Sequence, residues 1–153
     1  KDKKSNFVSL DFILKHSRFI SLSASSNIKN KYLISKKELN KMSKNSYLIN
    51  TARGNLVDTQ ALYTALKNNE IAGAAIDVLE TSEKYDRSIN QGWKHSENFS
   101  KTPLRKLKNV ILTPHMAGYT KKTITKQSNE IIRNINLLFN NKMPKSILNK
   151  KKQ

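Results

Sequence analysis

The sequence contains no cysteine, so a disulfide framework, a thiolate nucleophile and a cysteine-ligated zinc site are excluded among its 153 residues. It also contains no apolar run that approaches the roughly 18 to 20 residues of a membrane span. We therefore expect no membrane-spanning segment and no membrane partner. The lack of disulfides is compatible with a reducing cytoplasm, where we expect the protein to work.

Glycine is scarce, with four residues at positions 54, 73, 92 and 118. None of them forms the G-x-G-x-x-G pattern that lets a backbone approach the pyrophosphate of a dinucleotide. Such a loop is followed about 20 residues later by an acidic residue that binds a ribose hydroxyl. Asp2 lies too close to the first predicted helix, which follows Ser9, to serve in that role. The sequence therefore lacks a complete dinucleotide-binding loop.

Acidic residues are also few, because 11 Asp and Glu oppose 29 Lys and Arg, which gives a formal charge of +18. Lysine outnumbers arginine 24 to 5, and the lysines are scattered among many asparagines. Proteins that read bases and phosphates favour arginine for its fork of donors. No zinc-finger spacing or RNP-like aromatic motif accompanies the lysines. We expect a solvated basic surface and no nucleic-acid partner, and keep a basic nucleic-acid-binding domain as the more distant alternative.

Helix-like and strand-like patterns alternate along the chain. Ser9, Ser35, Asp58 and Thr120 are suitable N-caps. The helix after Ser35 begins with a capping box and is predicted to reach about residue 43, and the helix after Asp58 is predicted to stop near residues 68–69. The helix after Thr120 is long and carries one apolar face, formed by Ile131, Ile132, Ile135, Leu138 and Phe139.

Four apolar strands are predicted between these helices, over residues 18–22, 47–51, 71–78 and 109–113. Strands that are apolar on both faces and separated by helices are typical of a parallel sheet covered on both sides. The fold class is therefore α/β. Residues 80–108 carry no strand pattern and form a long loop, either a lid or an insertion.

Polar residues follow each predicted strand, at the edge where open α/β sheets bind ligands. They are the small polar run 23–27, then Arg53, then Asp77, then His115. Each has a structural alternative: a surface ion pair for Arg53, a turn or helix cap for Asp77, a loop residue for His115. Together they favour chemistry, because an arginine binds a carboxylate with paired hydrogen bonds and a histidine exchanges a proton near neutral pH. They suit an acidic substrate with an oxidisable hydroxyl or a reducible carbonyl.

Three segments around these residues carry a specific resemblance. Residues 47–58 (YLINTARGNLVD), 72–78 (AGAAIDV) and 109–118 (NVILTPHMAG) resemble, in order and spacing, the signatures of the D-isomer-specific 2-hydroxyacid dehydrogenases. Residues 19–34 also resemble the preceding part of that family's cofactor domain. The resemblance covers nearly the whole chain. It implies an NAD-dependent oxidoreductase that acts on a 2-hydroxy or 2-keto acid, with NADP as the alternative cofactor.

The resemblance also implies roles for individual residues. Arg53 would hold the substrate carboxylate, His115 would exchange the proton at the substrate oxygen, and Asp77 would fix the nicotinamide carboxamide. Other residues would line the cofactor: near the nicotinamide, Thr51, Ala52, Arg53 and the loop from His115 to Gly118, and along the dinucleotide, Ala24, Ser25 and Asn30.

Two positions depart from the family pattern. The family places a catalytic Glu five residues after the Asp, and that position is Ser82 here. A one-residue insertion would bring Glu83 into the role, and we prefer Glu83 to Glu80, which lies too close to the strand end. The early loop of the family commonly has His and Pro where this chain has Ser23 and Ser25, so dinucleotide packing there is expected to differ slightly.

The missing glycine loop and the start at Lys1 together predict a fragment. We expect the second half of a Rossmann-like NAD-binding domain over residues 1–142, with a long C-terminal helix and a basic tail at 143–153. The intact enzyme is expected to be a homodimer, and the isolated fragment to be inactive. The nearer alternative is a non-catalytic binding or regulatory module of the same fold.

Overall fold

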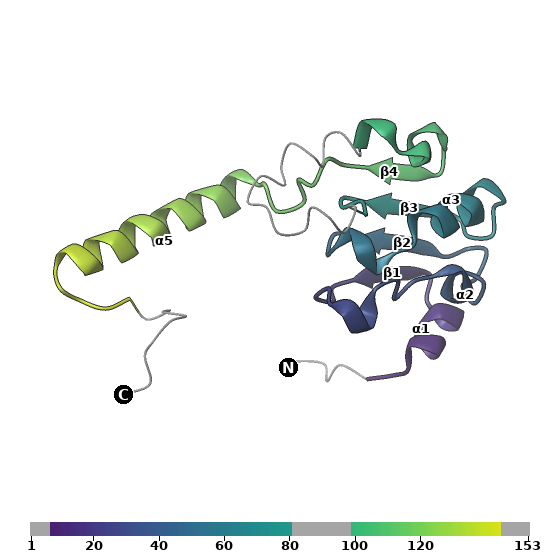
Figure 1. Cartoon of the computed structure of the whole chain (residues 1–153), viewed down its shortest axis with the longest axis horizontal. Helices are drawn as coiled ribbons and strands as arrows, with labels where there is room; N and C mark the ends of the chain where they lie inside the picture. Colours follow the sequence, from purple (N-terminus) through teal and green to yellow (C-terminus); the bar gives the residue numbers. More distant parts are fainter. Residues whose placement is uncertain (1–6, 81–98, 145–153) are drawn as a thin grey trace. The chain divides into compact units, whose positions relative to one another are not determined.

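A computed structural model describes residues 7–80 and 99–144 of the chain. Figure 1 shows the order of its elements. They are α1 (Leu10–His16), β1 (Phe19–Leu22), η1 (Ile28–Asn30), α2 (Lys36–Leu39), β2 (Tyr47–Asn50), η2 (Gly54–Leu56), α3 (Thr59–Lys67), β3 (Gly73–Ile76), η4 (Pro103–Lys106), β4 (Val110–Leu112) and α5 (Lys121–Phe139). The chain divides into two compact units, Lys1–Met116 and Ala117–Gln153, which are described separately.

The four strands form one parallel sheet in the order β1-β2-β3-β4. Their ends are in register: Leu22 lies opposite Asn50, and Asn50 opposite Ile76, which in turn lies opposite Leu112. The predicted α/β class and parallel sheet are confirmed. Because the strands end at one level, the segments that follow them meet at one edge of the sheet.

The predicted N-caps are confirmed. The side chains of Ser9, Asp58 and Thr120 accept hydrogen bonds from backbone amides in the first turns of α1, α3 and α5. Ser35 and Glu38 form the predicted capping box of α2. However, α2 ends at Leu39 rather than near residue 43. The chain then tightens into turns in which the amide of Met42 donates to the carbonyl of Leu39, and both side chains lie in the core.

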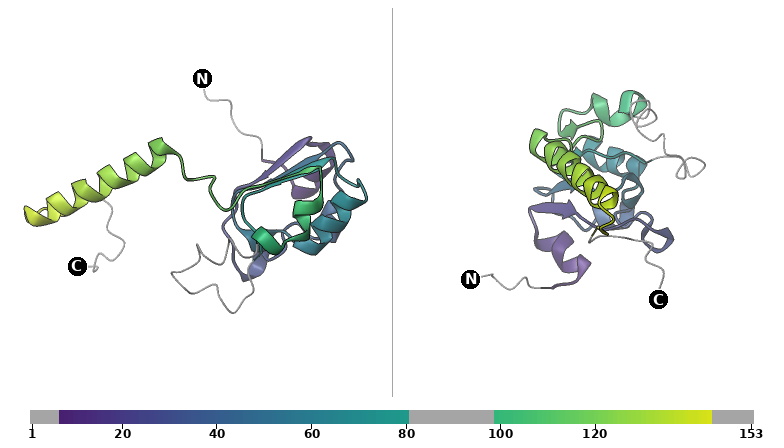
Figure 2. Two further views of the ribbon diagram at one scale, coloured as in Figure 1. Left: turned by 90° about the horizontal axis from the view of Figure 1, so that it is seen from above. Right: turned by 90° about the vertical axis from the view of Figure 1, so that its left-hand side faces the viewer.

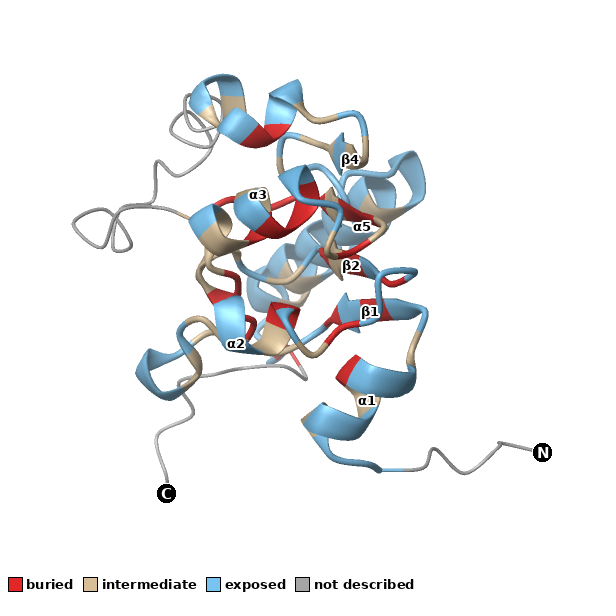
Figure 3. Ribbon diagram, turned by 90° about the vertical axis from the view of Figure 1, so that its right-hand side faces the viewer, coloured by how far each residue is buried: buried red, intermediate tan, exposed pale blue. Residues whose placement is uncertain are grey.

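The core of the first unit lies between the sheet and one layer of helices. Helix α2 contacts both α1 and α3, which places the three helices in the same layer (Figure 2). Buried residues gather on the side of the strands that faces these helices (Figure 3). Alternate strand residues are exposed instead, among them Phe19 (62%) and Ile111 (68%). The prediction of a sheet covered on both sides is therefore wrong for the described residues of this unit, since its helices all lie on one face.

The long loop predicted over residues 80–108 is partly packed on the core. Residues 81–98 lie outside the described residues. Beyond them, Leu104 in η4 is fully buried, Phe99 packs against the core, and the Arg105 guanidinium lies 5.3 Å from the centre of the Phe99 ring. This part of the segment belongs to the folded unit.

The second unit contains α5. The apolar residues predicted to share one face all lie within this helix. However, they are not buried, since Ile131, Ile135, Leu138 and Phe139 are each at least 45% exposed. Along the described part of the chain, no helix is long and apolar enough to cross a membrane.

Candidate functional site

An open groove of about 580 Å³ lies at the carboxyl ends of β1 and β2. Its walls are the segments that follow these neighbouring strands, and small residues dominate the first segment. The lining residues are Leu22, Ser23, Ala24, Ser25, Ser26, Thr51, Ala52 and Arg53. The structure therefore brings together five of the predicted site residues, Ala24, Ser25, Thr51, Ala52 and Arg53.

The loop that carries Arg53 is fixed by Asn50, the last residue of β2. Asn50 is fully buried. Its amide nitrogen donates to the carbonyl of Arg53 (2.9 Å), and its amide oxygen accepts from the backbone N–H of Ala52 (3.1 Å). The Arg53 side chain is exposed and donates to the carbonyl of Ala52 (2.7 Å). Sequence reasoning missed Asn50. A polar residue at the end of an apolar strand signals a buried hydrogen-bonding role, but not which backbone groups its amide binds.

Gly54 packs directly against the chain that follows β3. A Cβ on Gly54 would lie 2.0 Å from the carbonyl oxygen of Leu79. Next to this contact, the Tyr32 hydroxyl donates a hydrogen bond to the carboxylate of Glu80, and the Tyr32 amide donates to the carbonyl of Asn55 (2.9 Å). The hydrogen bond to Glu80 raises the pKa of Tyr32 above its ordinary value, and burial adds to the effect.

Asp77 follows β3 and is only 5% exposed. One of its carboxylate oxygens, Oδ1, accepts from the hydroxyl of Thr113 (2.5 Å) and from the amide of Met116 (2.8 Å). The backbone carbonyl of Asp77 accepts from the amide of His115 (2.9 Å), which also lies 3.0 Å from the carbonyl of Thr113. The loop that carries His115 is thus built over Asp77, as the order of the strand ends predicts.

Two further predicted site residues that the structure describes, Asn30 and Gly118, are not among the residues that line the groove. Both polar ends of the Asn30 side chain are used within its own loop, since Oδ1 accepts from the amide of Asn27 (2.7 Å) and Nδ2 donates to the carbonyl of Ser25 (2.5 Å). Gly118 belongs to the second unit. Glu83 lies outside the described residues. Within the described ranges, no group of three or more His, Asp or Glu residues could hold a metal ion.

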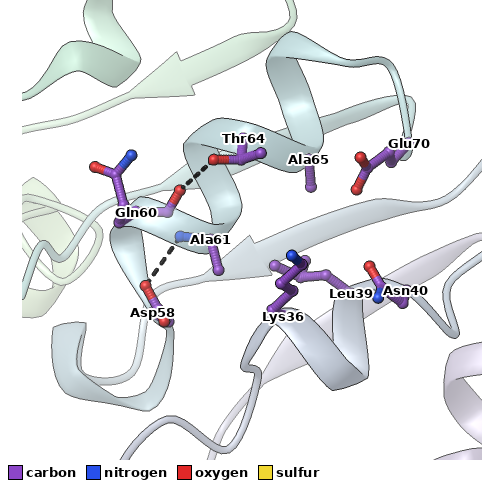
Figure 4. Close-up of a pocket in the computed structure, with 9 residues that line it drawn as sticks. All are labelled: Lys36, Leu39, Asn40, Asp58, Gln60, Ala61, Thr64, Ala65 and Glu70. Carbon is purple, nitrogen blue, oxygen red and sulfur yellow. Dashed lines mark hydrogen bonds between the residues drawn. The ribbon is translucent and has the colours of Figure 1, made fainter.

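A second cavity, of about 250 Å³, lies between α2 and α3 (Figure 4). Two hydrogen bonds inside α3 shape its wall: Asp58 accepts from the amide of Ala61, and Thr64 donates to the carbonyl of Gln60. None of the predicted site residues lines it. The groove at the sheet edge is therefore the better candidate for the site.

Residues 1–117 match the family described as "D-isomer specific 2-hydroxyacid dehydrogenase, NAD binding domain". The chain belongs to this family. The resemblance found in the three sequence segments is confirmed, and so is the Rossmann-like reading of the fold.

Individual relatives agree with the family. The chain is 37% identical over 129 residues to a D-specific alpha-keto acid dehydrogenase of Enterococcus faecium, covering 84% of this chain and 40% of the relative. It is 36% identical over 144 residues to a glyoxylate reductase of Thermofilum pendens, covering 94% of this chain and 38% of the relative. The chain thus spans about two fifths of the length of these curated relatives.

A solved structure shares the fold. It is the D-isomer specific 2-hydroxyacid dehydrogenase of Lactobacillus delbrueckii ssp. bulgaricus in its NAD-complexed form, which is 34% identical with a TM-score of 0.77. The similarity covers 94% of this chain and 43% of that one.

The residues of this chain fit part of an NAD site. The groove at the carboxyl ends of β1 and β2 is lined mostly by small side chains, and its volume of about 580 Å³ is in the range of small-molecule and cofactor sites. The chain has no glycine-rich phosphate-binding loop, because its four glycines do not form that pattern. The chain therefore offers a groove that could take part of the cofactor, but no glycine loop for its pyrophosphate.

Proposed function

We propose that this chain supplies the catalytic half of the cofactor domain in an NAD-dependent oxidoreductase that interconverts a 2-keto acid and a D-2-hydroxy acid. The observation that carries the proposal is that the loops of Arg53 and His115 both follow strands at the carboxyl edge of one parallel sheet, in a chain that belongs to a 2-hydroxyacid dehydrogenase family. The longer protein that carries this chain would be the enzyme, and this part alone would be inactive.

In this proposal Arg53 binds the substrate carboxylate. Its guanidinium is exposed at the groove on a loop that Asn50 holds in place. A guanidinium offers two parallel donors to a carboxylate, which fixes the orientation of the substrate as well as its charge. The paired hydrogen bonds would therefore hold the 2-keto carbon in one orientation relative to the groove.

His115 exchanges the proton at the substrate oxygen. Bound NADH would supply a hydride, that is one proton together with two electrons, to C2 of the keto acid. The carbonyl oxygen then takes a proton from His115, and the product is the 2-hydroxy acid. In the oxidative direction His115 accepts the same proton from the hydroxyl, which is ordinary general acid and base catalysis by an imidazole.

Glu83 is our candidate for the carboxylate that pairs with His115, with Glu80 as the alternative. The structure favours this order because the Glu80 carboxylate accepts a hydrogen bond from Tyr32. Glu83→Gln and Glu80→Gln, made separately, distinguish the two. We expect Glu83→Gln to move the pH–rate curve of keto-acid reduction toward acid, since a neighbouring carboxylate stabilises the protonated imidazole. A shift with Glu80→Gln instead would reverse the assignment.

The cofactor contacts remain as the sequence predicts. We propose that Thr51, Ala52, Arg53, Asp77, His115 and Gly118 lie near the nicotinamide, and that Ala24, Ser25 and Asn30 lie along the dinucleotide. NADP stays the alternative to NAD, because the residue that reads the ribose is not in this chain. We also propose that the longer enzyme is a cytoplasmic homodimer.

Arg53→Lys in the longer protein tests the function. We expect kcat/KM for a 2-keto acid to fall by about 10- to 100-fold, mainly through KM, because a hydrogen bond to a charged group contributes about 1.5 to 3 kcal/mol. Arg105→Lys is the matched control, since Arg105 stacks on Phe99 away from the groove. Unchanged kinetics in Arg53→Lys would contradict the role of Arg53. A wild-type protein that binds NAD but reduces no 2-keto acid would favour the non-catalytic binding module.

A further inference from the structure

The loop after β4 holds His115 in an unusual backbone conformation. His115 has a φ of 55°, in the left-handed region that residues other than glycine enter only at an energetic cost. Neighbouring interactions must offset that cost. The two backbone carbonyls that accept from the His115 amide, those of Asp77 and Thr113, provide part of the compensation.

The carboxylate of Asp77 provides a second fixation. Its Oδ1 atom binds the hydroxyl of Thr113, two residues before His115, and the amide of Met116, one residue after it. A single oxygen therefore holds the loop on both sides of His115. The carboxylate is almost completely shielded from water, which strengthens both hydrogen bonds relative to the same bonds on a surface.

Thr113 itself is anchored by its backbone. Its amide continues the ladder between β3 and β4 by donating to the carbonyl of Ile76 (3.1 Å). The hydroxyl of Thr113 is therefore held in place by the sheet. Its hydrogen bond to Asp77 restrains the loop in turn. Pro114, between Thr113 and His115, restricts the backbone further.

We propose that Thr113 is a positioning residue for the imidazole of His115, acting through the carboxylate of Asp77. The inference rests on the proposed function in one respect, namely that His115 is the residue that exchanges a proton with the substrate. Without the hydroxyl, Asp77 holds the loop from one side, and His115 relaxes from the left-handed conformation. The imidazole then leaves the orientation in which proton transfer is fastest, and a displacement of about 1 Å at such a group costs on the order of 100-fold in rate.

Two variants at one position separate the hydroxyl from the shape of the side chain. Thr113→Val keeps the branched shape and removes the hydrogen bond, whereas Thr113→Ser keeps the hydroxyl and removes a methyl group. Thr64→Val is the matched control, because it removes an exposed hydroxyl that only donates to a helix carbonyl. Thr113→Ala serves in place of Thr113→Val if the valine variant does not fold.

The enzymatic measurement uses the longer protein with a 2-keto acid. We expect Thr113→Val to lower kcat by about 10- to 100-fold with little change in the KM for NADH, and Thr113→Ser to restore kcat to within about 3-fold of wild type. A loss of kcat that serine does not rescue, or a Thr113→Val variant with wild-type kcat, overturns the proposal.

The second measurement does not depend on activity. Heteronuclear NMR of the same protein reports the imidazole nitrogens of His115 and the exchange rate of the Met116 amide. We expect Thr113→Val to shift the imidazole signals and to speed Met116 exchange by about 10-fold or more, while Thr64→Val changes neither. If the wild-type protein has no dehydrogenase activity, the proposed function fails and this measurement still decides whether Thr113 positions His115. Unchanged His115 signals in Thr113→Val overturn the positioning role.

Discussion

At the scale of single residues, Tyr32 links the loop before α2 to the chain that leaves β3. Its hydroxyl donates to Glu80, and its backbone adopts a φ of 53°. The hydrogen bond favours the protonated phenol in the folded state, so the pKa of Tyr32 is raised. A raised pKa means that the stabilisation is present below the unfolded value near 10 and is lost as the pH rises through the folded value.

Tyr32→Phe tests this dependence. We expect the wild-type chain to lose more stability than Tyr32→Phe when the pH is raised from 8 to about 11, because only the wild type must ionise a hydrogen-bonded phenol. Urea denaturation at both pH values measures the difference. Parallel pH dependence in the two proteins would show that Glu80 does not stabilise the protonated phenol.

Gly54 is required by close backbone approach rather than by a special φ. Gly54→Ala places a Cβ on the carbonyl of Leu79, and we expect a loss of about 1 to 3 kcal/mol in the free energy of unfolding. Gly118→Ala is the control, since its Cβ would meet nothing within 4 Å. Denaturation of both variants gives the comparison, and equal stabilities would contradict the close approach.

The residues of the site were predictable to different degrees. The placement of Arg53, Asp77 and His115 at one sheet edge could be predicted because each follows an apolar strand closely, and the ends of parallel strands lie at one edge. Asn50 could not be assigned from sequence, because its role depends on which backbone groups the buried amide reaches. The same holds for Thr113, whose hydroxyl is recognisable as functional only when Asp77 is seen beneath it.

At the scale of elements, α2 shows how a local motif stabilises a very short helix. Burial alone would raise the pKa of Glu38, but hydrogen bonds from the hydroxyl and amide of Ser35 outweigh it and lower that pKa. Because the folded value is lowered, the stabilisation is present above the ordinary value of 4.5 and is lost as the pH falls through the folded value.

Ser35→Ala removes the cap of α2. We expect a loss of about 1 kcal/mol in the free energy of unfolding at pH 7. The loss should be smaller near pH 3, where protonation of Glu38 has already weakened the capping box. Urea denaturation at the two pH values measures this, and Ser43→Ala is the control because its hydroxyl only accepts from a turn amide. Equal losses at both pH values would mean that Glu38 takes no part.

The elements themselves were largely predictable, and the failures have a physical cause. Caps at Ser9, Asp58 and Thr120 mark the starts of helices because only a few side chains can bind the free amides there. The end of α2 could not be predicted, since it is set by the burial of Leu39 and Met42 against other elements. The strand pattern alone could not show which sheet face is uncovered, because apolar residues such as Phe19 and Ile111 look the same in sequence whether they are covered or not.

At the scale of the whole molecule, the chain has a groove proposed for the nicotinamide but no glycine-rich phosphate loop. We expect the isolated chain to bind NAD too weakly for detection at micromolar concentrations, because the pyrophosphate contributes much of the binding and finds no glycine loop here. Isothermal titration calorimetry measures this directly, with the longer protein as the positive control. Micromolar affinity in the isolated chain would show that another element holds the phosphates.

The order of the sheet also bears on how the protein is made. Each strand pairs with the strand just before it in the sequence, as Phe19 with Tyr47 and Tyr47 with Gly73, so no pairing waits for a distant later segment. During synthesis the growing chain can add one strand at a time to the part that has already left the ribosome. Of the four described strands, β4 emerges last, and the loop of His115 follows it directly. The proposed proton-transfer residue is therefore ordered after the arginine side of the groove has formed.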